Sequence, residues 1–252
     1  MSTAPSQPTL VFLHGFAESP DIWADFTRDF PTRYRLLMPA LPGHGPNPQP
    51  VADYTIEAQA QAVLAEFDAA GANKVVLVGH SMGGYVALAL AEAHPERVAG
   101  LVLFHSTALP DTDEKRAARD ESAGFVRRHG VGKYMRSAIR PLLAPGNRKR
   151  LAAELKQLED TAAATPEATI LGCLEALKHR PDNIHILRDA KFPVLFIGGH
   201  DDPAVPLDTL LPQLALPAQS HALLLRGVGH LGFIEAPELT RRAVLDFCAA
   251  VC

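Results

Sequence analysis

The feature that most constrains the fold is a strand, a sharp turn and a helix that follow one another over residues 74–93. Residues 75–78 are a short valine-rich run that ends at Gly79, and Ser81 then lies between Gly79 and Gly83 in a G-x-S-x-G pattern. Glycine lacks a Cβ, so the chain can turn back tightly here and hold the serine hydroxyl above the end of a sheet. This context predicts that Ser81 is a nucleophile; a glycine-rich turn that merely contains serine is the alternative.

A serine hydroxyl needs a base, and the base needs a group that orients it. His230 fits best among the 11 histidines, because it lies in a glycine-flanked loop that leaves an expected strand at 223–226. The orienting acid is expected after a second buried strand, 193–198, where Asp201 and Asp202 stand side by side. A turn histidine that only binds backbone is the alternative reading of His230.

These candidate residues occur in the order serine, aspartate, histidine, which is the order in α/β hydrolases and not in chymotrypsin-like or subtilisin-like proteases. In its motifs the chain resembles the α/β-hydrolase fold family. The resemblance rests on five segments in register and leaves a gap between them at about 109–187; the segments are 9–16, 41–45, 79–84, 199–206 and 229–237.

The resemblance also selects between the two adjacent aspartates. In the family the acid usually lies three residues after a strand-end glycine and four before a proline. Gly199 and Pro206 therefore both select Asp202 over Asp201. Some relatives carry the acid after the preceding strand, but residues 105–108 contain no carboxylate here.

The family's chemistry, carried onto these positions, implies a catalytic triad. Ser81 is the nucleophile, His230 the base, and Asp202 the acid that orients the base. The resemblance further implies that the backbone N–H groups of Phe16 and Met82 form an oxyanion hole. No cofactor and no metal are implied.

Expected strands and helices alternate over both ends of the chain. Alternation of this kind predicts βαβ units, and therefore a mostly parallel sheet with helices on both faces. The expected strands are 9–13, 34–38, 74–79, 98–104, 192–198 and 221–226. The expected helices are 20–30, 55–70, 82–94, 206–218 and 237–250.

The segment 109–187 has a different pattern, with no strand and with helical stretches at 111–129, 148–164 and 166–179. It resembles the helical cap that covers the active site in many α/β hydrolases, where it would exclude water and shape an apolar pocket. We therefore expect a hydrolase core made of 1–108 and 188–252, with residues 109–187 inserted as a cap.

The first half of this cap is strongly basic. Residues 111–150 contain eleven Lys and Arg against five Asp and Glu. A solvated helix face is the ordinary explanation of such a run. The alternative is that one arginine turns inward and pairs with a carboxylate of the substrate.

The composition is that of an ordinary globular enzyme. A chain of 252 residues can bury a sizeable core as one domain with an insertion, and a formal charge of −4 gives no sign of nucleic-acid binding. Residues 1–8 lack the features of a signal peptide, and no apolar run reaches the roughly 18 residues of a membrane helix. The three cysteines, Cys173, Cys248 and Cys252, have neither metal nor redox spacing. We therefore expect a cytoplasmic protein that acts on a small molecule and binds neither nucleic acid nor membrane; a homo-oligomer is compatible with the sequence.

The function expected from these residues is that of a serine hydrolase that cleaves a carboxylic ester, or a related acyl bond, through an acyl-enzyme. A lactonase or a carbon–carbon bond hydrolase of a metabolic acid is the alternative. Haloalkane dehalogenases and epoxide hydrolases are disfavoured, because those relatives carry aspartate in place of Ser81. A ligand-binding receptor or a scaffold on the same fold is the non-enzymatic alternative.

Overall fold

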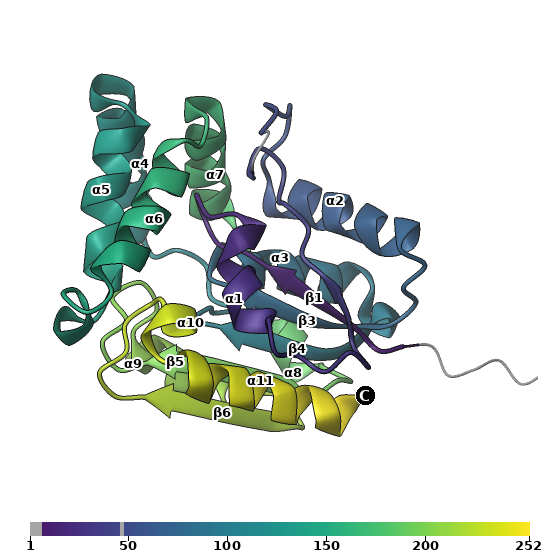
Figure 1. The fold of residues 1–252 in the computed structure, drawn as a ribbon. Coiled ribbons are helices and arrows are strands. Elements are labelled where there is room, and N and C mark those ends of the chain that lie inside the picture. The colour runs from purple at the N-terminus through teal and green to yellow at the C-terminus, as the bar shows by residue number, and fades with distance from the viewer. Residues whose placement is uncertain (1–6, 46–47) are drawn as a thin grey trace, which may run out of the picture.

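The fold is built on one sheet of six parallel strands, in the order β2-β1-β3-β4-β5-β6 (Figure 1). The computed structural model describes residues 7–45 and 48–252. The strands are β1 Thr9–Leu13, β2 Arg35–Leu37, β3 Val75–His80, β4 Val98–Phe104, β5 Val194–Gly199 and β6 Ser220–Leu225. All the predicted strands are confirmed, with small differences at their ends.

The central strands are continuous hydrophobic runs because both of their faces are covered. Every residue of β1, β3 and β5 is buried, whereas the edge strands β2 and β6 have exposed or half-buried residues. Runs of this kind are typical of parallel sheets. Because all strands point the same way, their carboxyl ends meet at one edge, where ligands bind in open α/β sheets.

Helices cover both faces of the sheet, as predicted (Figure 1). Phe67 and Leu88 belong to the core on one face, and Phe26 and Phe247 belong to the core on the other. The first face is covered by α2 Ile56–Ala69, α3 Met82–Ala93, α8 Ile184–Arg188 and α9 Leu207–Leu210. The second is covered by α1 Ala24–Thr27, α10 Gly232–Glu235 and α11 Pro237–Val251.

Two helices are shorter than predicted. In place of a helix over 20–30 there is a 3-10 turn, Pro20–Trp23, followed by the short α1. In place of a helix over 206–218 there is α9, followed by a 3-10 turn. We attribute both to proline, which cannot donate the backbone hydrogen bond that continues a helix. Pro31 follows the first segment, and Pro212 lies inside the second.

Between β4 and β5 the chain forms a group of helices beyond the carboxyl ends of the strands (Figure 1). These are α4 Asp113–His129, α5 Val131–Ile139, α6 Ala152–Ala163 and α7 Glu167–His179. The predicted helices of this insertion are confirmed, but α5 was not predicted. Its sequence contains Gly132, which lowers helix propensity. Packing stabilises it instead, since Val131 and Met135 are buried in the core cluster of these helices.

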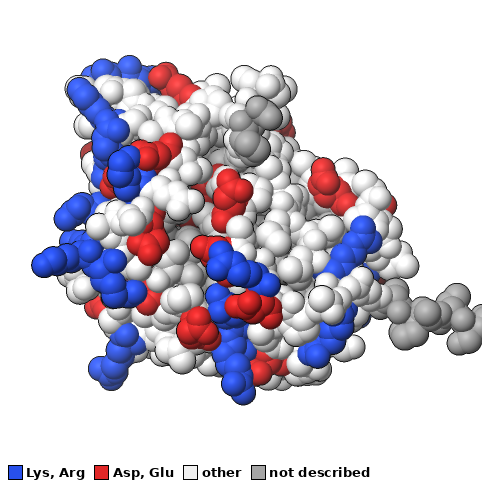
Figure 2. Space-filling view, in the orientation of Figure 1, with Lys and Arg blue, Asp and Glu red and all other residues white. Residues whose placement is uncertain are grey.

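The basic side chains of the insertion gather over the surface formed by α4–α6 (Figure 2). Several are paired within their own helix, such as Arg116 with Asp113 at 2.8 Å, and both of these side chains are exposed. This is the solvated helix face that the sequence favours for most of the run. Among the helices described here, none combines the length and the apolar character needed to cross a membrane.

The tight turn between β3 and α3 depends on glycine at two close approaches. A Cβ on Gly83 would lie 2.4 Å from the carbonyl oxygen of Leu13, and a Cβ on Gly79 would lie 2.4 Å from the carbonyl oxygen of Gly83. Both neighbours are backbone atoms at the centre of the sheet, so they have little freedom to move. The glycines of the motif therefore allow the start of α3 to touch the end of β1.

We expect Gly83→Ala to lower the free energy of unfolding by about 1–3 kcal/mol, because the added methyl group overpacks a rigid contact. Urea denaturation measures this change. Gly146→Ala is the matched control, because nothing lies within 4 Å of the position where its Cβ would be. Equal unfolding midpoints for the two variants would contradict the close approach.

Candidate active site

Ser81 lies at the turn between β3 and α3 in a left-handed conformation, with φ 50° and ψ −116°. Few residues other than glycine adopt this region, and it persists only where the surroundings hold it. The Ser81 N–H donates to the carbonyl of Phe104 at 3.0 Å, and the Ser81 carbonyl accepts from the hydroxyl of Ser106 at 2.8 Å. The turn directs the residue into a cavity at the carboxyl edge of the sheet.

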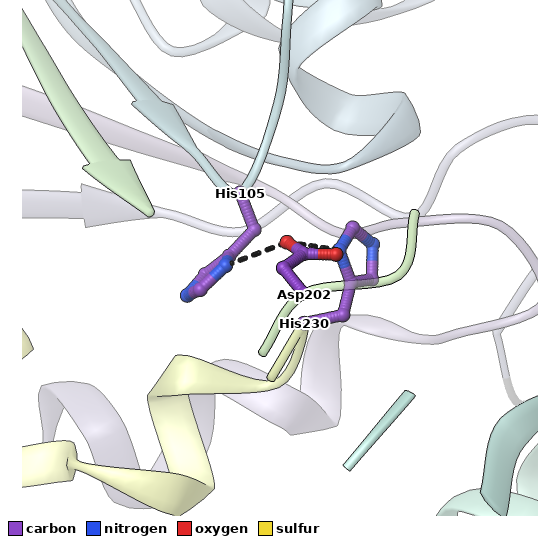
Figure 3. A group of neighbouring side chains, drawn as sticks. All are labelled: His105, Asp202 and His230. Carbon is purple, nitrogen blue, oxygen red and sulfur yellow. Dashed lines mark hydrogen bonds and ion pairs between the residues drawn. The ribbon is translucent and has the colours of Figure 1, made fainter. Parts of the chain in front are cut away.

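Asp202 and His230, from the loops after β5 and β6, lie against each other (Figure 3). The Nδ1 atom of His230 is 2.9 Å from Oδ2 and 3.0 Å from Oδ1 of Asp202. Both side chains are buried. Ser81 and His230 line the same cavity, but no hydrogen bond joins their side chains in this structure.

The carboxylate of Asp202 is held ionised by its neighbours. Burial opposes its charge, but attraction to His230 and hydrogen bonds from two histidines outweigh burial, so the pKa of Asp202 lies far below its usual 3.8. Its Oδ1 atom also accepts from the backbone N–H groups of Ala204 and Val205, at 2.8 and 2.9 Å. Asp201 is exposed. Of the two adjacent aspartates, Asp202 is therefore the one that contacts the imidazole.

His105, which follows β4, also binds Asp202, and sequence reasoning missed it. Its Nδ1 atom donates to Oδ2 of Asp202 at 3.0 Å, from the side opposite His230 (Figure 3). Burial lowers the pKa of His105, which is therefore the neutral imidazole with its proton on Nδ1. His105 follows the strand after which some relatives carry the acid. This position in the sequence could have marked His105 as a residue of the site.

The two residues expected to form the oxyanion hole through their backbone lie around the same cavity. Phe16 and Met82 both line it. Neither the Phe16 N–H nor the Met82 N–H has a backbone acceptor within residues 7–45 and 48–252. His14 and His44 support this loop, because their Nε2 atoms accept from the N–H groups of Leu41 and Ala17. Burial, followed by repulsion from His44, lowers the pKa of His14 to about 3, so His14 is neutral.

A buried ion pair between Glu18 and His80 joins three loops of the site. Glu18 Oε2 accepts from the N–H of Gly15 at 2.6 Å and lies 2.9 Å from His80 Nδ1. His80 Nε2 donates in turn to the carbonyl of His230 at 3.0 Å. The pair therefore connects the loop that carries Phe16, the residue before Ser81, and the backbone of His230.

The charges of this pair support each other. Burial opposes ionisation of both groups, but attraction to His80 lowers the pKa of Glu18 below 4.5, and attraction to Glu18 raises the pKa of His80 above 6.5. Neither residue was predicted to be functional. The pair joins positions 62 residues apart in the chain, so no local pattern indicates it.

Glu235 fixes the loop of His230 to the insertion. Its Oε1 atom accepts from the N–H groups of Gly229 and Leu231, and its Oε2 atom accepts from the Ala144 N–H at 2.8 Å. The backbone N–H of His230 also donates to the carbonyl of Leu142 at 2.7 Å. The position of the imidazole therefore depends on the segment between α5 and α6.

The cavity has a volume of about 290 Å³. Its apolar wall comes from α5 and the residues after it, including Tyr134, Met135, Ile139 and Leu142. Its polar side carries Ser81, His230 and several charged groups of α4 and its neighbours. An apolar pocket with a few convergent polar groups is typical of a small-molecule site.

One group of side chains among the described residues could ligate a metal ion, namely His105, Asp202 and His230, whose ligand atoms all lie within 4.8 Å of one another. Their separations are those of hydrogen bonds, since each imidazole Nδ1 faces a carboxylate oxygen at 2.9–3.0 Å. A metal ion would have to separate both pairs inside a buried region. The arrangement fits the orientation of an imidazole and does not fit a metal centre.

We expect Glu18→Gln to lower the free energy of unfolding by about 1–3 kcal/mol, because a charged hydrogen bond is lost from a buried site. The contribution of Glu18 is present above its usual pKa of 4.5 and is lost as the pH falls through its lowered pKa. The contribution of His80 is present below its usual pKa of 6.5 and is lost as the pH rises through its raised pKa.

The difference in stability between the wild type and this variant is therefore greatest between pH 4.5 and 6.5 and declines on both sides. Denaturation curves across this pH range measure it. Glu66→Gln, at an exposed position of α2, serves as the control. A difference that stays constant with pH would contradict the ion pair.

The sequence and the fold are similar to those of known proteins. Residues 8–237 match the model of the alpha/beta hydrolase fold. The chain is 32% identical to the pimeloyl-[acyl-carrier protein] methyl ester esterase of Aromatoleum aromaticum, with 92% of this chain and 95% of that protein covered. It is 29% identical to a 2-hydroxy-6-oxononadienedioate/2-hydroxy-6-oxononatrienedioate hydrolase of Paraburkholderia phymatum, covering 97% and 88%. A thermophilic esterase from Thermogutta terrifontis has a similar structure, with a TM-score of 0.90, 27% identity and coverage of 97% and 90%. The chain belongs to the α/β-hydrolase fold family, as its motifs predict.

Proposed function

We propose that the protein is a carboxylesterase that hydrolyses an ester of a small molecule through an acyl-enzyme on Ser81. The Ser81 hydroxyl attacks the ester carbonyl while Nε2 of His230 takes its proton, and the same proton then passes to the leaving alcohol. Water attacks the acyl-enzyme in the second half-reaction, with His230 again as base. The N–H groups of Phe16 and Met82 stabilise the negative oxygen in both halves.

The observation that carries this proposal is the contact between Nδ1 of His230 and the carboxylate of Asp202 beside the cavity that Ser81 lines. With its Nδ1–H bound to a carboxylate, the imidazole keeps its Nε2 lone pair free for the proton of a serine. The carboxylate also stabilises the imidazolium that forms during the attack. An ionised Asp202 at this position supports both roles.

The relatives support an ester as the substrate. The protein from Aromatoleum aromaticum is a methyl ester esterase, and the structure from Thermogutta terrifontis is that of an esterase. The hydrolase of Paraburkholderia phymatum supports a carbon–carbon bond hydrolase as the second candidate. A lactonase would use the same groups. A receptor or a scaffold would need neither a buried Asp202–His230 contact nor a serine beside it.

The helical insertion is proposed to act as the cap of this site, with the bounds 109–187. Its helices α4 and α5 supply side chains to the cavity, and Glu235 joins the loop of His230 to the segment after α5. A cap in this position would exclude water from the acyl-enzyme until the alcohol has left. The cytoplasmic location stays a prediction from the sequence, as does the oligomeric state.

Hydrolysis of p-nitrophenyl esters from acetate to long-chain acids tests the function. We expect Ser81-dependent turnover with an optimum at short chains, because the cavity is only about 290 Å³. The Ser81→Ala variant should lose nearly all of this activity. A wild type that is inactive on every ester would contradict the esterase and direct the search to lactones, diketone acids and non-catalytic binding.

Asp202→Asn and Asp201→Asn form a matched pair for the acid. We expect Asp202→Asn to lower kcat by about 10³- to 10⁴-fold, because an amide cannot hold the imidazole in the required tautomer. Asp201→Asn should stay within about twofold of the wild type, as surface substitutions usually do. Steady-state kinetics on one ester measures both, and the reverse order of effects would overturn the assignment of Asp202.

A further inference from the structure

One wall of the cavity is basic. Lys115 and Arg119 reach it from α4, and Arg180 reaches it from the end of α7. Asp111 is the acid that lies among them. These groups line the same cavity as Ser81, so their charges act on whatever substrate the nucleophile attacks.

Arg180 makes most of its contacts within the protein, through Nη1, Nε and the plane of its guanidinium. Its Nη1 atom binds Oδ1 of Asp111 at 2.6 Å and the carbonyl of Leu177 at 3.0 Å, and its Nε atom binds the carbonyl of Leu109 at 3.2 Å. Its guanidinium also lies 4.2 Å from the ring centre of Tyr85. Both Asp111 and Arg180 are buried. This pair is a structural ion pair, in which Asp111 neutralises Arg180.

Arg119 and Lys115 keep donors free. Arg119 uses its Nε atom to bind Oδ2 of Asp111 at 3.1 Å, and Lys115 uses its ammonium to bind the carbonyl of Ala204 at 3.1 Å. Within residues 7–45 and 48–252, the two η nitrogens of Arg119 and the remaining protons of Lys115 have no acceptor. The Arg119 side chain is 28% exposed, so it is accessible from the cavity.

The charges of this wall do not balance. Three cations meet one carboxylate there, and the other carboxylate of the cavity, Glu18, is already paired with His80. Burial lowers the pKa of Lys115, and attraction to Asp111 opposes this only in part. A half-buried ammonium without a carboxylate partner is unfavourable, and a bound anion would remove that cost.

We propose that Lys115 and Arg119 form an anion subsite that binds a free carboxylate of the substrate. The inference rests on the proposed esterase function. It narrows the substrate to an ester that also carries a free carboxylate, such as a half-ester of a short dicarboxylic acid. Arg119 offers the planar pair of donors that suits a carboxylate, and Lys115 adds a point charge.

Lys115 connects the subsite to the loop after β5. Its ammonium binds the carbonyl of Ala204, and the N–H of Ala204 binds Oδ1 of Asp202 at 2.8 Å. The subsite therefore adjoins the loop that carries the acid of the triad. The cavity, at about 290 Å³, lies at the lower end of small-molecule sites. A short chain between the ester and the carboxylate fits this space.

Two pairs of esters test the subsite. In the first pair, monomethyl adipate carries a free carboxylate on the acyl side and dimethyl adipate carries none. In the second pair, carboxymethyl butyrate carries a free carboxylate on the alcohol side and its methyl ester carries none. We expect the wild type to prefer the anionic member of at least one pair in kcat/KM. That preference should fall about 10- to 100-fold in Arg119→Gln and in Lys115→Gln, mainly through KM, because a charged hydrogen bond is lost. The preferred pair identifies the side that carries the carboxylate.

Arg116→Gln is the matched control, because Arg116 lies on the same helix, is paired with Asp113 and does not line the cavity. It should keep the wild-type preference. Lys115→Gln leaves both ion pairs of Asp111 intact, so its result does not depend on any misfolding of Arg119→Gln. Equal kcat/KM within both pairs, or a preference that survives both substitutions, would overturn the subsite even where neutral esters are hydrolysed.

Binding of adipate, measured by isothermal titration calorimetry, separates this inference from the proposed function. If no ester is hydrolysed, the esterase proposal fails, and adipate binding alone then decides the subsite. We expect binding to the wild type and to Arg116→Gln, with an affinity about 10-fold or more weaker in Arg119→Gln and Lys115→Gln. Absence of binding to the wild type would overturn the subsite.

Discussion

The close contact between the end of β1 and the start of α3 is the constraint on which the site depends. Gly83 allows it, because a Cβ there would lie 2.4 Å from the Leu13 carbonyl. The contact holds Ser81 at φ 50°, in a conformation that costs of order 1–3 kcal/mol when nothing enforces it. Phe16, Ser81 and Met82, which lie on either side of this contact, line one cavity. One packing contact therefore lies beneath both the proposed nucleophile and the proposed oxyanion hole.

Buried charge at this edge is almost entirely compensated. Three carboxylates with little exposure each contact a basic side chain, in the pairs Glu18–His80, Asp111–Arg180 and Asp202–His230. Asp202 is also bound by a second imidazole, that of His105. An uncompensated charge here would cost several kcal/mol, so each pair holds its loops in place. Against this background the free donors of Lys115 and Arg119 stand out. The charge that the fold leaves unpaired is the charge that is available to a substrate.

Local patterns in the sequence were sufficient to predict the strands, most helices and the residues of the motifs. The valine runs and the glycines around Ser81 act over a few residues. The choice of Asp202 over Asp201 came instead from the resemblance to the α/β-hydrolase fold family. Contacts between distant residues were not predictable in this way. His105 and Asp202 are 97 positions apart, and Arg180 and Asp111 are 69 apart. The helix α5 was missed for a related reason, since its stability comes from burial of Met135 against neighbouring helices and not from its own propensity.

The central claim is that Ser81 forms a covalent acyl-enzyme, activated by His230. Reaction with a dialkyl fluorophosphate, followed by intact-protein mass spectrometry and peptide mapping, tests it most directly. The account predicts one phosphoryl group per chain, attached to Ser81, absent from Ser81→Ala and formed far more slowly in His230→Ala. No adduct, or an adduct on another residue at the wild-type rate, would contradict it.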